Sequence, residues 1–506
     1  MLTYSFTTAY VVDVLIAVMG IASVTYYLWL VGIRWSSVRE LLYTALGRIL
    51  SMLAGLAVAA VFTLIMVAVA VQMRYLSQPW IVVPLYWLPF VITTVAVSQA
   101  FDKWRCTKSG LSRSLRTIQA MAATRLLLSL ILLILVCLPA FASMRYLIAV
   151  PLFITSITGC LSITVIRYVR LTGWQHLILE VLLSLPSVMW LFSLALRLTA
   201  MLLPITGRSA SATPDYLVAM VNVALAVLAT TPVSGIEVLF SRKRLWLALS
   251  VMSAACIVIM FVPFSPFDDG VAVQRHYWFH SEIASFDINN EQTNKTSGVL
   301  VIKRDPYTFD EIVPSLQSKG YEYNVSRGLG DDCDTALYCG VPVYWHSFGP
   351  QLAKAMFIST PPPPPFAAPA SFSAPPRTCV ADVCTYHFVL KGGPHNIITF
   401  WPYENITLSQ WSLMSPLVPS YTRLDRPVYV IYHSTATYME SWSETFTVEF
   451  NVPQSLQSGP IVEVSLHSHQ LYHPDDLTTE YQSMMDAMPH YFNIAPASSF
   501  RYNYVF

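Results

Sequence analysis

The sequence predicts a multipass α-helical membrane domain of about eight spans over residues 1–264, followed by an all-β, sandwich-like domain over residues 265–506. Three observations predict this division. Only 12% of the 506 residues are charged, whereas roughly 25% is usual in a soluble domain. The deficit is concentrated before residue 265, where long apolar runs dominate. After residue 265, apolar and polar residues alternate between turn signals, which is typical of half-buried strands.

Eight apolar runs are each long enough to cross the hydrocarbon core of a bilayer, which takes roughly 20 residues. They are 8–33, 49–73, 79–101, 122–143, 146–166, 176–203, 216–240 and 245–264. Pro84, Pro89 and Pro151 predict kinks in the third and fifth runs. No Lys or Arg precedes the first run, and it is longer than the apolar core of a secretory signal. We therefore expect an uncleaved first helix.

The basic residues of the membrane domain predict its orientation. Loops after the first, third, fifth and seventh runs hold thirteen of them: Arg34, Arg39, Arg48, Lys103, Arg105, Lys108, Arg113, Arg116, Arg167, Arg170, Arg242, Lys243 and Arg244. The other loops hold only Arg74, Arg145 and Arg208. Because short loops rich in Lys and Arg stay in the cytosol, we expect both termini on the opposite side.

Three glycosylation sequons support this orientation. They begin at Asn294, Asn324 and Asn405, and all three follow residue 265. Such sequons accept sugar only in exported segments. The second domain is therefore predicted to face the lumen of the endoplasmic reticulum or the cell exterior.

Four cysteines of this domain come as two close pairs, Cys333 with Cys339 and Cys379 with Cys384. Thiols oxidise in exported compartments, so disulfides are favoured, although four cysteines allow three connectivities. Free thiols and a zinc site are the alternatives. Structural zinc sites usually combine a C-x2–4-C knuckle with histidines at fixed offsets, a combination that these pairs do not show.

Alternation of period two predicts the strands of the second domain, at 384–391, 395–401, 428–433, 445–452 and 461–469. Only 309–319 and 475–488 are predicted to be helical. This pattern favours an antiparallel β-sandwich. The proline-rich stretch 361–376 is expected to form a surface loop within the domain.

Several segments then resemble one family in the family's order. They are SGVLVIKRDPYT at 297–308, CDTALYCGVPVYW at 333–345, GGPHNIITFW at 392–401, ITLSQWSL at 406–413 and the final YVF at 504–506. This domain resembles the C-terminal lumenal domain of the endoplasmic reticulum metallopeptidase 1 family. In the membrane domain, AYVVDVLIAVMG at 9–20 resembles the first helix that follows the family's peptidase domain.

The resemblance also implies a departure. Full-length family members carry a lumenal peptidase domain that binds two zinc ions through His, Asp and Glu ligands. Only seven residues precede the first apolar run, and no segment matches those ligand motifs. No catalytic, metal or cofactor-binding residue is therefore assigned, and zinc is expected only in full-length members. The chain is expected to be either a peptidase-less relative or the C-terminal part of a longer or split gene.

Two other patterns bear on metal chemistry. HSHQLYHPDD places His467 and His469 on one face of a strand, with His473, Asp475 and Asp476 after them. A His-x-His pair with a carboxylate can bind zinc, but solvent-facing residues of a strand and turn give the same pattern, and we favour that interpretation. His276 and His280 are four apart, which would align them on a helix, yet their aromatic neighbours favour a strand.

Five charged residues fall inside or beside the apolar runs: Asp13, Arg125, Glu180, Arg197 and Glu237. Charges inside a membrane domain often mark function. They can instead form structural pairs or snorkel from a span end. We favour the structural interpretation and keep a proton or ion pathway as the alternative.

These observations favour a multipass glycoprotein of the endoplasmic reticulum membrane, with both termini in the lumen. Its second domain is expected to be a non-catalytic binding or scaffold module. The expected partners are the lipid bilayer and either a separate peptidase subunit or another lumenal protein. The net charge of +1 gives no support to a nucleic-acid partner. A transporter or channel, and a fragment of an active zinc peptidase, are the alternatives.

Overall fold

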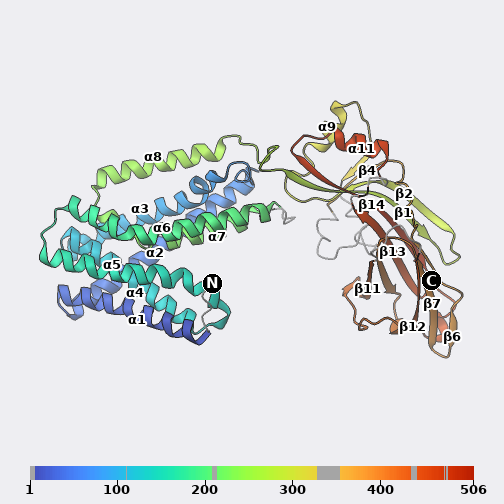
Figure 1. Cartoon of the computed structure of the whole chain (residues 1–506), viewed down its shortest axis with the longest axis horizontal. Helices are drawn as coiled ribbons and strands as arrows, with labels where there is room; N and C mark the ends of the chain where they lie inside the picture. Colours follow the sequence, from blue (N-terminus) through green and yellow to red (C-terminus); the bar gives the residue numbers. More distant parts are fainter. Residues whose placement is uncertain are drawn as a thin grey trace. The chain divides into compact units, whose positions relative to one another are not determined.

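The computed structural model describes residues 6–109, 111–207, 213–327, 354–434, 442–471, 473 and 477–506. The chain divides into two compact units, a helical unit formed by Met1–Gly207 with Thr213–Phe267 and a β-unit formed chiefly by Asp268–Phe506. Figure 1 labels the elements of both. The predicted fold class, a multipass helical part followed by a sandwich-like β part, is confirmed.

The helical unit contains eight α-helices within the described residues. They are α1 (Phe6–Val31), α2 (Trp35–Ala68), α3 (Leu88–Ser109), α4 (Arg113–Val136), α5 (Arg145–Tyr168), α6 (Gly173–Thr206), α7 (Asp215–Thr230) and α8 (Arg242–Phe261). Short helical turns η1 (Pro79–Ile81), η2 (Val83–Trp87), η3 (Pro139–Met144) and η4 (Ile236–Val238) connect or extend them. Pro84 lies in the π-helical turn η2, just before α3, and Pro151 lies inside α5.

Seven described helical segments are long and apolar enough to cross a membrane, and α7 is shorter. The expected span 216–240 therefore differs from the structure. With 16 residues, α7 is about 24 Å long, less than the ~30 Å core of a bilayer. It ends at Thr230, two residues before Pro232, which lacks the N–H of a helical hydrogen bond and disfavours continuation. Gly235 then adopts a positive φ of 102°, which no α-helix contains. The segment from Thr231 to Ser241 is irregular, apart from η4.

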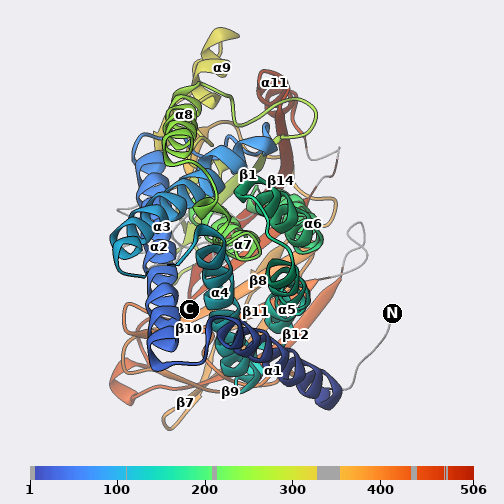
Figure 2. The same ribbon diagram turned by 90° about the vertical axis from the view of Figure 1, so that its left-hand side faces the viewer.

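Helix α4 lies at the centre of the helical unit and packs against α1, α2 and α5. Figure 2 shows it between α2 and α5. All nine residues from Thr117 to Arg125 are buried, so every side of this part of α4 is covered. The polar side chains of this segment have partners of two kinds. Thr117 and Thr124 donate to carbonyls one turn earlier on α4, whereas Gln119 donates to the Thr44 hydroxyl of α2.

The described residues of the β-unit form two sheets. The larger has nine strands in the order β10-β11-β8-β13-β14-β1-β2-β4-β3, and the smaller has the order β5-β7-β12-β9, with β6 paired to β7. The strands are β1 (Gln274–Phe286), β2 (Gln292–Val301), β3 (Val325–Arg327), β4 (Met356–Ser359), β5 (Ser371–Ser373), β6 (Thr378–Val380), β7 (Val383–Lys391), β8 (His395–Pro402), β9 (Thr407–Trp411), β10 (Tyr421–Arg423), β11 (Arg426–Ser434), β12 (Ser443–Asn451), β13 (Val462–Leu471) and β14 (Phe492–Val505).

The core of the sandwich lies between the two sheets. Phe388 and Phe446 from the smaller sheet contact Phe400 of the larger one, at ring-centroid distances of 5.3 and 6.3 Å. This contact follows from the alternation in the sequence, because the apolar residues of each strand point to one face. Among the described strands, every pair is antiparallel except β1 with β14, which is parallel. The prediction of an antiparallel sandwich is therefore wrong for this pair.

Two short helices cover another part of the larger sheet. Helices α9 (Ile312–Ser318) and α11 (Thr479–Asp486) bury Leu316 and Tyr481 in a second core with Trp278 of β1. The hydroxyl of Tyr481 donates to the carbonyl of Trp278 at 2.9 Å. Figure 1 shows both helices beside β4. The proline-rich segment is part of this unit, with Phe366 packed against Phe500 at 4.8 Å.

Candidate functional sites

The structure separates the five charged residues that the sequence singled out in the helical unit. Arg197 is exposed on α6. Asp13, Arg125, Glu180 and Glu237 are each less than 10% exposed. Because uncompensated buried charges are costly, the partners of these four decide what each can do.

Two of the four form ion pairs between helices. Asp13 of α1 pairs with Arg145 at the start of α5, at 3.3 Å. Glu237 of η4 pairs with Arg48 of α2. Its two carboxylate oxygens also accept hydrogen bonds from the Ser98 hydroxyl and the Gly235 N–H, both at 2.7 Å. These contacts support the structural interpretation for Asp13 and Glu237, and they fix the irregular segment after α7 against α2 and α3.

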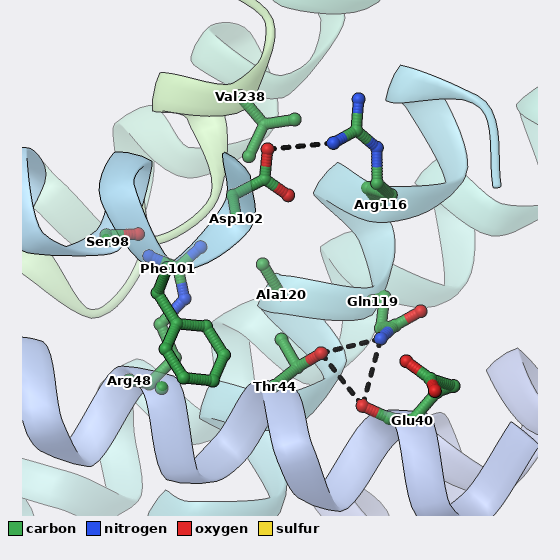
Figure 3. Close-up of a pocket in the computed structure, with 11 residues that line it drawn as sticks. Glu40, Thr44, Arg48, Ser98, Phe101, Asp102, Arg116, Gln119, Ala120 and Val238 are labelled. Atoms are coloured by element: carbon green, nitrogen blue, oxygen red, sulfur yellow. Dashed lines mark hydrogen bonds and ion pairs between the residues drawn. The ribbon is translucent and has the colours of Figure 1, made fainter. Parts of the chain in front are cut away.

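A cavity of about 50 Å³ lies next to the Arg48–Glu237 pair. Figure 3 shows its polar lining. The Gln119 amide donates to the Thr44 hydroxyl at 2.6 Å and to the Glu40 carbonyl at 3.1 Å, and Arg116 pairs with Asp102 at 2.8 Å. The space is large enough for a few water molecules. Most of these polar groups pair with one another, although the Nε of Arg116 has no hydrogen-bond partner among the described residues.

Glu180 of α6 belongs to a second polar cluster. Its Oε1 accepts from the Ser162 hydroxyl of α5 and lies 2.9 Å from Nε2 of His176, one turn earlier on α6. His176 is fully buried. Thr172 and Gln175 form a capping box at the start of α6. This cap fixes where the helix begins and so positions the His176 and Glu180 side chains.

Arg125 lines a smaller cavity, of about 20 Å³, together with Glu180. Thr124 and Leu128 of α4, Thr155, Thr158 and Gly159 of α5, and Thr231 and Pro232 after α7 also contribute. The guanidinium Nε and Nη2 of Arg125 have no hydrogen-bond partner within the described part of the chain. This buried cation is the least satisfied charge among the five.

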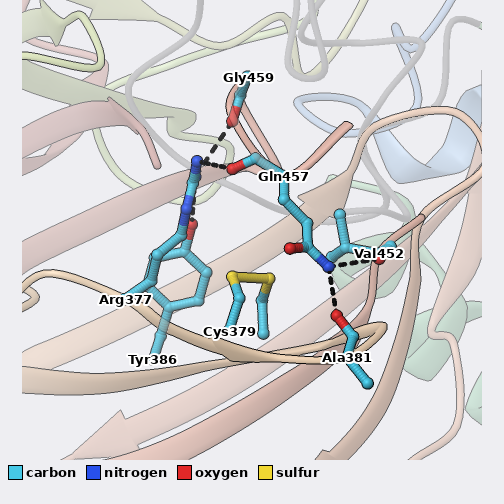
Figure 4. Close-up of a disulfide and its surroundings, with 8 residues drawn as sticks. Arg377, Cys379, Ala381, Tyr386, Val452, Gln457 and Gly459 are labelled. Atoms are coloured by element: carbon cyan, nitrogen blue, oxygen red, sulfur yellow. Dashed lines mark hydrogen bonds between the residues drawn. A yellow bond between two sulfur atoms is a disulfide. The ribbon is translucent and has the colours of Figure 1, made fainter. Parts of the chain in front are cut away.

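The disulfide of the β-unit closes the β6–β7 hairpin. Cys379 and Cys384 are directly opposite in the ladder and are bonded to each other. Figure 4 shows Arg377 beside this bond, where its guanidinium donates to the Tyr386 hydroxyl and to the carbonyls of Gly459 and Gln457. The hairpin is thus tied to the turn before β13. Cys333 and Cys339 lie outside the described residues.

The histidines of HSHQLYHPDD do not converge. His467 is buried in β13, which contradicts the expected solvent-facing position. His469 is half-buried and stacks on His395 of β8, at 5.5 Å between ring centroids. Burial, and then His395, lower the pKa of His469 to about 4. Asp475 and Asp476 fall outside the described residues. Within the described residues, no group of three or more His, Cys, Asp or Glu side chains could hold a metal ion.

His276 and His280 lie on β1, so the strand interpretation is right. The Nε2 of His280 is 2.7 Å from the Pro361 carbonyl. His276 stacks on Phe492 at 4.0 Å, and neither of its ring nitrogens has a hydrogen-bond partner among the described residues. Burial lowers the pKa of His276 to about 3. Both side chains are therefore packing residues in the core of the β-unit.

All three sequon asparagines are exposed, Asn294 on β2, Asn324 just before β3 and Asn405 in the turn before β9. Asn405 has a φ of 62°, which asparagine tolerates in tight turns. Each side chain can therefore be reached from solvent in the folded unit.

The sequence did not identify the partners of the buried charges. Arg48 and Arg145 were counted as loop residues that set topology, and His176 was not singled out. Each is buried in the bundle. His176 has a local signal, since it precedes Glu180 by four residues and so shares its helix face. The partners of Glu237 and Asp13 are 189 and 132 residues away, a separation that no local pattern reveals.

Comparison with known proteins identifies the β-unit. Residues 271–504 match the family described as endoplasmic reticulum metallopeptidase 1, C-terminal domain. None of the curated proteins compared with the chain matches it. Among solved structures, the chain is similar to the yeast delta-COP-I mu-homology domain complexed with Dsl1 WxWxV peptide. The identity is 8% and the TM-score 0.21, over 46% of this chain and 96% of that chain. A likeness at that TM-score carries no argument about fold or function.

Proposed function

Since residues 271–504 are an endoplasmic reticulum metallopeptidase 1 C-terminal domain, we propose that the chain is the non-catalytic membrane and lumenal portion of such a protein. In this proposal the helical unit is the anchor in the endoplasmic reticulum membrane. The β-unit is a binding module that recognises a lumenal protein, with a peptidase subunit as the leading candidate. The observation that carries the proposal is the family match over residues 271–504, whose described part forms two sheets.

Three features support a lumenal position for the β-unit. The basic residues of the helical unit gather in alternate connections, as expected of cytosolic loops. The asparagines of all three sequons are exposed. The disulfide between Cys379 and Cys384 is of a kind that persists in oxidising compartments. In our proposal these features favour a lumenal position for both termini, which requires α7 and the irregular segment after it, residues 215–241, to complete one crossing of the membrane together.

The binding surface that we propose follows the end of the smaller sheet. Strand β9 is an edge strand, and the chain then runs to β10, the edge of the larger sheet. Met414 on this connection is fully exposed, and Val418 is 63% exposed. The indole N–H of Trp411 donates to the Ser415 carbonyl at 2.9 Å and so holds the connection against its strand. Exposed apolar side chains on an ordered segment beside two sheet edges are typical of a protein contact.

Site-specific photocrosslinking tests this surface. A photoreactive amino acid at Met414 is expected to crosslink a lumenal polypeptide in microsomes, because that side chain would lie in the contact. The same group at Val380, an exposed apolar position on β6, is the matched control. Equal crosslinking from both positions, or crosslinking to lipid alone from Met414, would contradict the proposed surface.

Zinc analysis tests the non-catalytic assignment. The purified chain is expected to hold less than stoichiometric zinc and to show no aminopeptidase turnover. Zinc at one or two equivalents, together with turnover that a chelator abolishes, would show that the chain is itself an enzyme. Turnover that appears only when a separate family peptidase domain is added would support the binding role.

A further inference from the structure

Arg125 is placed like a ligand-binding residue in the middle of the helical unit. It is 12 residues from the start of α4, which is about 18 Å along the helix axis. Its side chain is 3% exposed and lines the cavity of about 20 Å³. Two of its three guanidinium nitrogens have no partner within the described residues. A buried cation with free donors requires an acceptor to offset its desolvation.

The neighbouring helix leaves room for this guanidinium. A Cβ at Gly159 of α5 would collide with Nη1 and Cζ of Arg125. A glycine in the interior of a helix lowers helix stability by roughly 0.5–1 kcal/mol relative to alanine. Its position opposite Arg125 therefore has a packing reason, because it lets the cation lie against the backbone of α5.

Glu180 does not form a direct ion pair with Arg125. It lines the same cavity, but its Oε1 is occupied by Ser162 and His176. Among the described residues, no carboxylate forms an ion pair with Arg125. The cavity between them has room for an occupant of about the size of one water molecule.

We propose that this cavity binds a small inorganic anion of the size of chloride, held by the guanidinium of Arg125. Thr155, Thr158 and Ser184 line the same space, but their hydroxyls donate to backbone carbonyls of their own helices. The free donors of the cavity are therefore those of Arg125. The irregular backbone at Thr231 and Pro232 forms one wall. Irregular backbone at membrane depth is found where it is buried in protein or lines a site for ions and solutes. This site is independent of the function proposed for the β-unit.

Radiolabelled chloride binding to the purified full chain tests the site. The wild type is expected to bind one chloride saturably, displaced by bromide and not by gluconate. Arg125→Gln should abolish this binding. The matched control is Arg197→Gln, which removes an exposed arginine from α6 and should bind as the wild type does.

A second variant guards against misfolding of Arg125→Gln. Gly159→Ala keeps the charge but displaces the guanidinium, and it should weaken chloride binding by at least tenfold while the protein remains monodisperse. No saturable chloride binding in the wild type, or unchanged binding in both Arg125→Gln and Gly159→Ala, would show that the cavity holds only water and would overturn the proposal.

Discussion

His276 shows how a single buried side chain makes the β-unit sensitive to acid. Its ring is fully buried against Phe492, and burial lowers its pKa to about 3, from about 6.5 in an unfolded chain. The unfolded state therefore binds more protons as the pH falls below 6.5. The stability contributed by neutral His276 is fully present above that pH and is lost towards pH 3.

Replacing His276 should remove this share of the pH dependence. At pH 5 the protonation of His276 in the unfolded state disfavours folding by about 2 kcal/mol relative to pH 7.5. We expect His276→Leu to narrow the difference in thermal unfolding midpoint between these pH values. His387→Leu, at an exposed position of β7, is the control and should leave the difference unchanged. An equal effect of both substitutions would contradict this account.

The ion pair between Arg48 and Glu237 yields a second prediction at this scale. Removing one member of a buried pair leaves the other uncompensated, which typically destabilises by 3–5 kcal/mol. Glu237→Gln should therefore lower the thermal unfolding midpoint of the detergent-solubilised chain strongly. The double variant Arg48→Met with Glu237→Leu should recover much of the loss, because it buries no charge. A double variant that is less stable than Glu237→Gln would show that the pair acts as more than two compensating charges.

At the scale of elements, the end of α7 depends on Gly235. Its φ of 102° is one that side chains rarely adopt, and a Cβ there would lie 2.8 Å from the Ala120 Cβ and 2.9 Å from the Thr117 carbonyl of α4. Gly235→Ala should therefore cost about 1–3 kcal/mol of stability, measured as a lower unfolding midpoint. Gly173→Ala, at the first position of α6 with open space around it, should be neutral or slightly stabilising. The reverse order would exclude strain at Gly235.

The sequence predicted the elements whose pattern is local. The strands β7, β8, β11, β12 and β13 lie within two residues of the predicted ranges. Strands β7 and β12 bury one face and therefore alternate with period two, whereas β8 and most of β13 are buried on both faces. Strand β1 is buried on both faces over residues 278–282, so buried and exposed residues do not alternate there. The end of α7 was missed although Pro232 and Gly235 were visible, because the apolar run continues to Phe240 and its hydrophobicity masked the break.

Contacts between residues far apart in the chain could not be predicted from the sequence at any scale. The order of the sheets, the parallel pairing of β1 with β14 and the partners of Asp13 and Glu237 join residues more than 100 positions apart. Such contacts are chosen by the fold as a whole and leave no local period. The candidate anion cavity was missed for the same reason, since its walls come from α4, α5, α6 and the segment after α7.

For the molecule as a whole, the decisive property is which side of the membrane the β-unit occupies. If it is lumenal, Asn294, Asn324 and Asn405 are accessible to the glycosylation machinery. We expect up to three size steps on electrophoresis, all removed by an endoglycosidase, with each Asn→Gln substitution at a used sequon deleting one step. Unchanged mobility, together with digestion of the β-unit by protease added outside sealed microsomes, would reverse the orientation.

Because β14 is a central strand, the larger sheet cannot be completed until this strand has been synthesised. Strand β14, residues 492–505, lies between β13 and β1 in the larger sheet. Until the ribosome releases those residues, β1 and β13 each lack a neighbour and keep open backbone edges, which invite aggregation. The nascent unit must therefore wait for β14, so chaperone occupancy should persist until this strand has been released. Deletion of this strand alone would leave a chain unable to mature.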